Sequence, residues 1–112
     1  MGTELMKKNQ WLIGLLAITV FSSAAFAANP QAGREKTKAC AACHGPDGNS
    51  ASPEFPRLAG QNRDYLEHAL LGYKSGKRKN PIMAPQAANL SKSDIADIAA
   101  FYAGQTGLTT KR

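Results

Sequence analysis

Cysteine is scarce in this chain of 112 residues, which contains only Cys40 and Cys43. Two cysteines allow a single disulfide bond, and a bond between residues so close together would close a very short loop. Because the stabilisation from a disulfide bond grows with the length of the loop that it closes, this one would contribute little. The sequence therefore excludes a fold that is held together by disulfide bonds.

Histidine is equally scarce, and His44 and His68 are the only two. A structural zinc site needs four cysteine or histidine ligands. The chain offers only these histidines and the two cysteines, and the side chains of adjacent residues 43 and 44 point apart. A dithiol redox motif of the thioredoxin type would be expected within a βαβ pattern, and no strand pattern is present. Zinc binding and dithiol redox chemistry are both disfavoured.

Long hydrophobic runs are absent except for one near the amino terminus, over residues 11–21. A membrane span needs about 20 apolar residues, so this run is too short. It follows two lysines and precedes small residues that end at Ala27, which is the layout of a secretory signal peptide. We therefore expect residues 1–27 to be a signal peptide cleaved after about Ala27. Residues 28–112 are then the folded domain, and the periplasm is its expected location.

Acidic residues are few, with 8 Asp or Glu against 14 Lys or Arg. A basic surface favours an acidic protein partner or an anionic membrane surface. Nucleic acid is not an expected partner of an exported protein. Four cations lie close together as Lys74, Lys77, Arg78 and Lys79. This basic segment is a candidate docking surface for an acidic partner, and ordinary solvated charge is the alternative that the sequence leaves open.

The folded domain is predicted to be all-α, because no alternating strand pattern appears. Helix-forming residues predict a first helix over residues 30–42, and Gly45 and its neighbours end it. Apolar residues at helical spacing predict a second helix over residues 63–75. A third is expected to open at Ser91, with Asp94 placed for a capping box. A domain of this size buries little apolar surface, so we expect a cofactor to stabilise it.

Cys40, Cys43 and His44 form a C-x-x-C-H motif within the segment KACAACHGPDG. This spacing is the recognised signature of covalent haem attachment. Two thiols about one helical turn apart can each add to one of two neighbouring vinyl groups of the porphyrin. The histidine that follows is placed to bind the iron as a neutral imidazole, with its other ring nitrogen hydrogen-bonded. We therefore expect one haem c, held by two thioether bonds, with His44 as an iron ligand.

The second axial ligand decides what such a haem does, because an iron with two protein ligands is usually an electron carrier. Met83 is the only methionine of residues 28–112, and Pro81 and Pro85 stiffen the loop expected around it. His68 lies beside the apolar face of its predicted helix and is expected to be solvated. The alternative for Met83 is a packing role in the core. We expect Met83 to be the axial ligand, which raises the reduction potential relative to histidine.

These motifs resemble those of the class I cytochromes c, in particular the short bacterial group of cytochrome c-553 and of each half of the di-haem cytochrome c4. The resemblance covers nearly all of residues 28–112 and is carried by the segments CAACHG, PRLAGQ, YLEHALLGYKSGKR, NPIMAP and LSKSDIADIAAFYA. It implies a small class I cytochrome c fold, with three to four helices wrapped around one covalently bound haem. It also implies that the Pro56 carbonyl accepts a hydrogen bond from His44, that Leu58 packs on the haem, and that Gly33 lets the last helix cross the first.

The same resemblance implies a periplasmic carrier that cycles between Fe(III) and Fe(II) and moves single electrons between respiratory redox proteins. Such a carrier transforms no substrate, so neither an enzymatic activity nor a small-molecule substrate is expected. Its expected partners are redox proteins with an acidic docking surface, such as a membrane-bound oxidase or reductase. Two alternatives remain open: a haem subunit of a larger dehydrogenase or oxidase complex, and a haem-based ligand sensor or peroxidase with a labile Met83.

Overall fold

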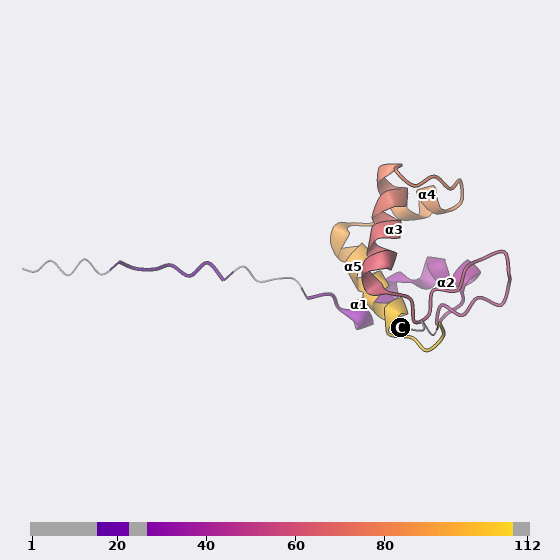
Figure 1. Ribbon diagram of the computed structural model, residues 1–112, viewed down its shortest axis with the longest axis horizontal. Coiled ribbons are helices and arrows are strands. Elements are labelled where there is room, and N and C mark those ends of the chain that lie inside the picture. Colours follow the sequence, from indigo (N-terminus) through magenta and orange to yellow (C-terminus); the bar gives the residue numbers. More distant parts are fainter. Residues whose placement is uncertain (1–15, 23–26, 109–112) are drawn as a thin grey trace, which may run out of the picture.

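The computed structural model describes residues 16–22 and 27–108, and the second of these ranges contains five α-helices and no strand (Figure 1). The helices are α1 (Pro30–Lys36), α2 (Lys38–His44), α3 (Arg63–Ser75), α4 (Met83–Ala88) and α5 (Lys92–Ala103). The predicted all-α class is confirmed, although five helices form where three to four were expected. In this described part of the chain, no helix has both the length and the apolar character that crossing a bilayer requires.

The core of the domain lies where α5 packs against α1 and α3 (Figure 1). Helix α4 packs against α3. The apolar stripe of α5 faces this core, with Ile95, Ile98, Ala99 and Tyr102 all buried, as its helical spacing predicts. Leu66 of α3 joins the same buried cluster. Helix α5 is therefore the element that joins α1 to α3.

Helices α1 and α5 cross at Gly33, which is buried. A Cβ atom placed there would lie 3.0 Å from Phe101 Cβ and closer still to the carbonyl group of Asp97. Only a residue without a side chain allows the two backbones to approach so closely. The close crossing that the family resemblance implies is present, and its centre is one turn nearer the start of α5 than Phe101.

The first predicted helix is interrupted at Thr37, so the expectation of one continuous helix over residues 30–42 was wrong. The Thr37 hydroxyl donates a hydrogen bond to the Arg34 carbonyl over 2.8 Å, and the residue is buried. Threonine in a helix competes in this way for backbone acceptors and often bends the chain. The break divides the segment into two helices, and α2 continues through His44 before Gly45 ends it at φ 83°.

The boundaries of α3 agree with the prediction, and Gly76 ends it in the left-handed conformation at φ 80°. The capping box at the start of α5 is also present, with Ser91 and Asp94 bonding to each other's backbone N–H groups. Helix α4 was not predicted. Pro85 lies within it, and proline has no N–H group to donate. The segment around Met83 is therefore helical rather than a loop.

The loop over residues 45–62 is tied to the carboxyl end of α5. The Gly60 N–H donates to the Tyr102 carbonyl over 2.9 Å, and the Leu108 N–H donates to the Ala59 carbonyl over 2.8 Å. Gly48 packs edge-on against the Tyr102 ring, where a Cβ atom would lie 2.7 Å from the ring and φ is 83°. These contacts fix a segment that three prolines keep free of regular structure.

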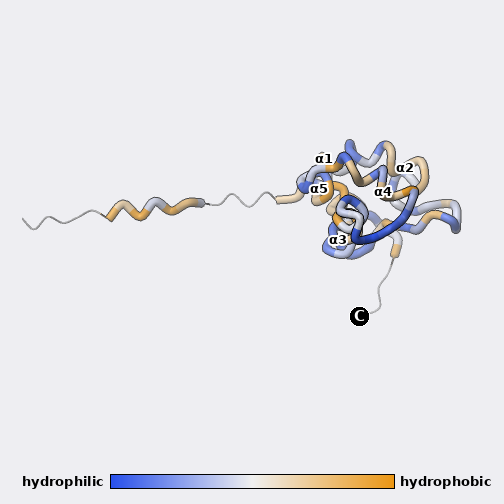
Figure 2. Tube along the Cα trace, turned by 90° about the horizontal axis from the view of Figure 1, so that it is seen from above, coloured by the Kyte–Doolittle hydropathy of each residue, from blue (hydrophilic) through white to orange (hydrophobic). Residues whose placement is uncertain are grey.

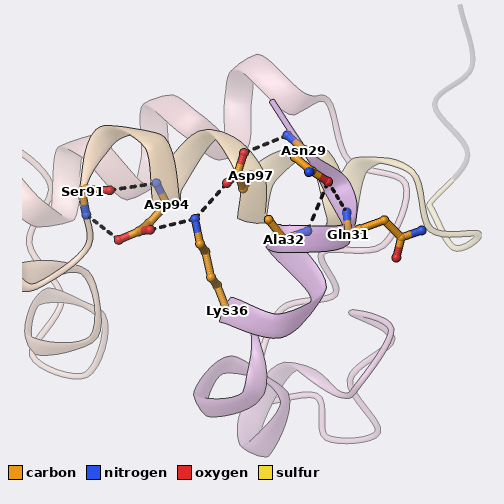
Figure 3. A network of polar contacts seen from close by, with 7 residues as sticks. All are labelled: Asn29, Gln31, Ala32, Lys36, Ser91, Asp94 and Asp97. Atoms are coloured by element: carbon orange, nitrogen blue, oxygen red, sulfur yellow. Dashed lines mark hydrogen bonds and ion pairs between the residues drawn. The ribbon is translucent and has the colours of Figure 1, made fainter. Parts of the chain in front are cut away.

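A polar network also joins α1 to α5, and it links Lys36 and Asn29 to Asp94 and Asp97 (Figure 3). The Lys36 ammonium lies 2.8 Å from a carboxylate oxygen of Asp97 and 2.9 Å from one of Asp94. The second oxygen of Asp97 accepts the backbone N–H of Asn29 over 2.7 Å. The Lys36 contact lowers the pKa of Asp94 to about 2, and the Asn29 N–H, then Lys36, lower the pKa of Asp97. The network anchors the chain at the point where α1 begins.

Substituting Asp97→Asn should flatten the dependence of stability on pH in acid. A carboxylate with a lowered pKa in the folded protein stabilises it above about pH 4, and this contribution is lost as the pH falls through the lowered pKa. Asparagine keeps an acceptor for Asn29 but loses the charge that faces Lys36. The variant should be less stable at neutral pH and should lose less stability on acidification. Denaturant unfolding at a series of pH values measures both effects.

The matched control is Asp64→Asn, because the Asp64 side chain is 94% exposed and takes no part in this network. It should keep the acid dependence of the wild type. An Asp97→Asn protein with an unchanged acid slope would contradict the assigned role of the network.

The expected signal peptide is described only in part, because residues 1–15 and 23–26 lie outside the described residues. Residues 16–22 run clear of the helices and are mostly apolar (Figure 2). Their large side chains, Leu16, Ile18, Val20 and Phe21, are almost wholly exposed. The domain therefore completes its core without this segment.

Candidate haem site

Two adjoining cavities, of about 190 and 160 Å³, lie between α2, α3, α4 and the loop over residues 45–62, with α5 lining the larger one. All six residues predicted to bind haem line them. Cys40, His44, Pro56 and Met83 line both, Leu58 lines the larger and Cys43 lines the smaller. The fold thus gathers residues that are up to 43 positions apart in the sequence around one space.

The two cysteines lie three residues apart on α2 and both are free thiols. The helix places them on one side, facing the cavities. Burial raises the pKa of the Cys40 thiol, and the neighbouring Cys43 raises it further. Cys40 is therefore held as a neutral thiol at neutral pH, at the edge of an apolar space.

His44 is buried at the end of α2. Its Nδ1 atom lies 2.8 Å from the Pro56 carbonyl oxygen, which can only accept, so Nδ1 carries the proton and donates it. The bond predicted from the family resemblance is therefore present. The tautomer that it selects leaves the lone pair on Nε2, which is the arrangement typical of a metal-binding histidine.

Met83 reaches the same space from a different element, as the first residue of α4. Helix α4 packs on α3 rather than on α2. The backbone N–H groups of Ile82 and Met83 both donate to the side-chain oxygen of Asn80, each over 2.9 Å. Sequence reasoning did not single out Asn80, although an Asn-Pro dipeptide is a recognised signal for a turn or a helix start.

Apolar side chains form the remaining wall of the larger cavity, and they include the apolar face predicted for the helix over residues 63–75. They are Tyr65, Leu66, Ala69, Leu70 and Tyr73 of α3 and Ile98, Ala99 and Tyr102 of α5. The Tyr102 hydroxyl is buried without a hydrogen-bond partner among the described residues, and burial raises the pKa of Tyr102. His68 is exposed and lines neither cavity, which agrees with its predicted solvation.

Arg78 also lines the larger cavity, unlike the nearby lysines 74, 77 and 79. Its guanidinium lies 5.0 Å from the ring centre of Tyr73 and 5.9 Å from that of Tyr65, and it donates to the Tyr65 hydroxyl over 3.4 Å. Cation–π contacts of this kind hold an arginine against an aromatic surface. From the sequence, Arg78 was recognised only as part of the basic segment. No sequence pattern indicated that it would contact the two tyrosines.

The residues present fit a covalently bound haem better than a bare metal ion. Across the described residues, no group of three or more His, Cys, Asp and Glu side chains could hold a metal ion. The cavities instead combine two thiols one helical turn apart, an imidazole with a free Nε2 and a thioether, within apolar walls. This donor set suits iron in a porphyrin, which supplies four ligands of its own.

A family model for cytochrome c matches residues 30–104. The chain belongs to the cytochrome c family. Cytochrome c4 of Pseudomonas aeruginosa is 45% identical to it over 98 residues, which are 87% of this chain and 49% of that protein. Cytochrome c-554(548) of Halomonas halodenitrificans is 45% identical over 82 residues, which are 70% of this chain and 99% of that protein.

A solved structure agrees with these relatives. The crystal structure of reduced recombinant cytochrome c4 from Pseudomonas stutzeri matches with a TM-score of 0.70 and 41% identity, over 73% of this chain and 48% of that one. This cytochrome therefore spans about half the length of the cytochrome c4 proteins and nearly all of cytochrome c-554(548). It is a class I c-type cytochrome of the cytochrome c4-like group, and its cofactor is haem c.

Proposed function

We propose that residues 28–112 form a single-haem electron carrier in which Cys40 and Cys43 attach the haem and His44 and Met83 are the axial ligands. One observation carries this proposal: an imidazole and a thioether from separate helices line the same cavities as the two thiols. Two protein ligands leave the iron no open position for substrate chemistry, so the protein acts as a carrier rather than an enzyme.

The residues around the site have distinct tasks in this proposal. When bound, haem supplies a one-electron Fe(III)/Fe(II) couple. The Pro56 carbonyl orients the imidazole of His44 and increases its basicity through the Nδ1–H bond. The Met83 thioether is a soft ligand that favours the ferrous state and raises the potential. Leu58 and the apolar side chains of α3 and α5 exclude water from the ring.

Carbon monoxide binding to the dithionite-reduced protein tests this function. The proposed carrier should give a c-type visible spectrum that carbon monoxide leaves unchanged, because both axial positions are filled. A spectrum that shifts promptly on addition of the gas would mean an open or labile sixth position. The sensor or peroxidase alternative would then replace the carrier.

The proposed location is the periplasm, after removal of residues 1–27. The anchoring of the Asn29 N–H by Asp97 supports this boundary, because the ordered domain then starts within two residues of the expected cleavage site. The uncleaved run at residues 16–22 stays exposed, as expected of a leader that is not part of the core. Sequencing the amino terminus of the exported protein tests the boundary.

The proposed partners are redox proteins with an acidic surface, docking beside the Met83 side of the cavities. Lys77 and Lys79 supply the charge for this contact. Both are exposed, and neither has an ion-pair partner within the part of the chain that the structure describes. Lys74 is less available, because it donates to the Ala88 carbonyl over 3.0 Å.

Replacing both Lys77 and Lys79 by alanine should slow oxidation of the ferrous protein by ferricyanide, an anionic probe, by about threefold at low salt. The wild-type rate should fall as the ionic strength rises, because screening weakens the attraction. Stopped-flow measurements with a cationic cobalt complex should not show this loss. Lys92→Ala is the control, since Lys92 is exposed and, unlike Lys77 and Lys79, has no neighbour in the chain that lines either cavity. Equal rates for all three proteins at low salt would remove the docking role.

A second candidate, a haem subunit held in a larger dehydrogenase or oxidase complex, is favoured by one feature. Ile82 is 56% exposed beside the smaller cavity, and a permanent partner at this edge would cover it. Gel filtration of the native periplasmic extract separates the two candidates. A free carrier elutes near the size of a single small domain, and a subunit elutes with its complex.

A further inference from the structure

Asn80 and Pro81 have the geometry of a helix start, although the regular part of α4 begins only at Met83. The Ala84 N–H donates to the Asn80 backbone carbonyl over 3.0 Å, which is a helical i to i−4 bond. Ile82 already has helical dihedral angles, with φ −88° and ψ −49°. Asn80 is therefore the N-cap residue, Pro81 is the first helical residue, and Met83 is the third.

The Asn80 side chain makes the contacts that an N-cap residue makes. Its Oδ1 atom accepts the N–H groups of Ile82 and Met83, each over 2.9 Å. These are the N–H groups at the second and third helical positions, which have no acceptor within the helix. Pro81 fits the first helical position, between Asn80 and Ile82, because proline has no N–H to satisfy and its φ suits a helix.

The other end of α4 is held independently of this cap. Lys74 donates to the Ala88 carbonyl, and α4 packs along α3. Loss of the cap would therefore loosen the first turn of the helix and leave the last turn in place. Met83 lies in that first turn, and Asn80 itself lines the smaller cavity beside it.

We propose that Asn80 is a positioning residue for Met83, because its carboxamide fixes the turn from which the thioether reaches the iron. This inference rests on the proposed role of Met83 as the axial ligand. With the cap in place, the Met83 backbone N–H is bound to a fixed acceptor and the side chain starts from one position. Without it, the first turn frays and external ligands compete for the iron.

The test uses the full-length haem-loaded protein with Asn80→Ala and Asn80→Ser. Alanine removes the acceptor, whereas serine is an N-cap residue of similar strength and carries no charge. Asn80→Ala should weaken the long-wavelength absorption band that marks methionine bound to ferric haem. It should also raise the rate of carbon monoxide binding to the ferrous protein about fivefold, the factor that a typical N-cap contributes to an equilibrium. Asn80→Ser should restore both values toward those of the wild type.

The chain contains a matched control in a second Asn-Pro cap. The Asn29 side chain accepts the N–H groups of Gln31 and Ala32 over 2.9 and 3.2 Å, with Pro30 as the first residue of α1. No residue of α1 lines either cavity. Asn29→Ala should lower the stability of the protein but leave the absorption band and the carbon monoxide rate unchanged.

The outcomes separate this inference from the function on which it rests. If Asn80→Ala behaves like Asn29→Ala, with lower stability but an unchanged band and rate, Asn80 has only a structural role and the inference is wrong. If Met83→Ala also keeps the band, the ligand assignment fails and the proposed function fails with it. A band lost in Met83→Ala and weakened in Asn80→Ala, with recovery in Asn80→Ser, supports both.

Discussion

Replacing Met83 by alanine should convert an inert haem into one that binds external ligands. The ferrous variant should bind carbon monoxide readily, and the ferric variant should lose the long-wavelength band of methionine ligation. Its reduction potential should fall by on the order of 100 mV, within the roughly 0.8 V over which axial ligands set haem potentials. The cause is the loss of the soft thioether that stabilises Fe(II) relative to Fe(III). Visible spectroscopy and a redox titration measure these effects.

The control for this variant is His68→Ala, which removes the only other candidate ligand. His68 is exposed on α3 and lines neither cavity, so its loss should change none of these properties. If His68→Ala rather than Met83→Ala opened the iron to carbon monoxide, the ligand assignment would have to be reversed.

Replacing Gly33 by alanine should destabilise the domain by about 3 kcal/mol, within the upper range for overpacked sites. The direction of this stability change is informative, because alanine in place of a helical glycine ordinarily stabilises a protein by up to about 1 kcal/mol. Here the added methyl group meets the backbone of Asp97 and the Cβ atom of Phe101, and the two helices would have to move apart. Denaturant unfolding of the haem-loaded protein, followed by circular dichroism, gives the change in free energy.

Gly104→Ala is the matched substitution at the other end of α5. The new Cβ atom would meet its nearest neighbour at 3.4 Å, an ordinary contact, and φ is −79°. Its effect should stay within about 0.5 kcal/mol, as for a surface substitution. A Gly33→Ala protein as stable as Gly104→Ala would show that the crossing of α1 and α5 relaxes without cost.

Local sequence signals were sufficient for the long helices and for the attachment motif. The apolar spacing predicted α3 and the buried stripe of α5, because each helix has at least three turns over which a repeat can be read. The residues Cys40, Cys43 and His44 were found because their chemistry depends on spacing within one turn. The family resemblance added Pro56 and Leu58, whose positions in the loop over residues 45–62 follow no local rule. Met83 was found as the only methionine of residues 28–112.

The features that the sequence did not reveal depend on tertiary contacts or on short segments. Thr37 interrupts the first helix through a hydroxyl bond made at a buried position, and threonine is only mildly unfavourable in a helix. Helix α4 has six residues, too few for a periodic pattern, and Pro81 and Pro85 favoured a loop. The contacts of Arg78 with Tyr65 and Tyr73 join residues from α3 and from the loop that follows it.

The ties between the loop over residues 45–62 and α5 have a consequence for how the protein opens. The Pro56 carbonyl that holds His44 belongs to a loop fastened to the carboxyl end of α5 through Gly60 and Tyr102. Motion that frees the imidazole must therefore break contacts of the helix that packs against both α1 and α3. The histidine side of the site and α5 form one cooperative unit, and their amides should exchange with solvent only in the same rare openings. The methionine side lies on α4, which packs on α3 rather than on α5, so its amides should exchange in separate openings.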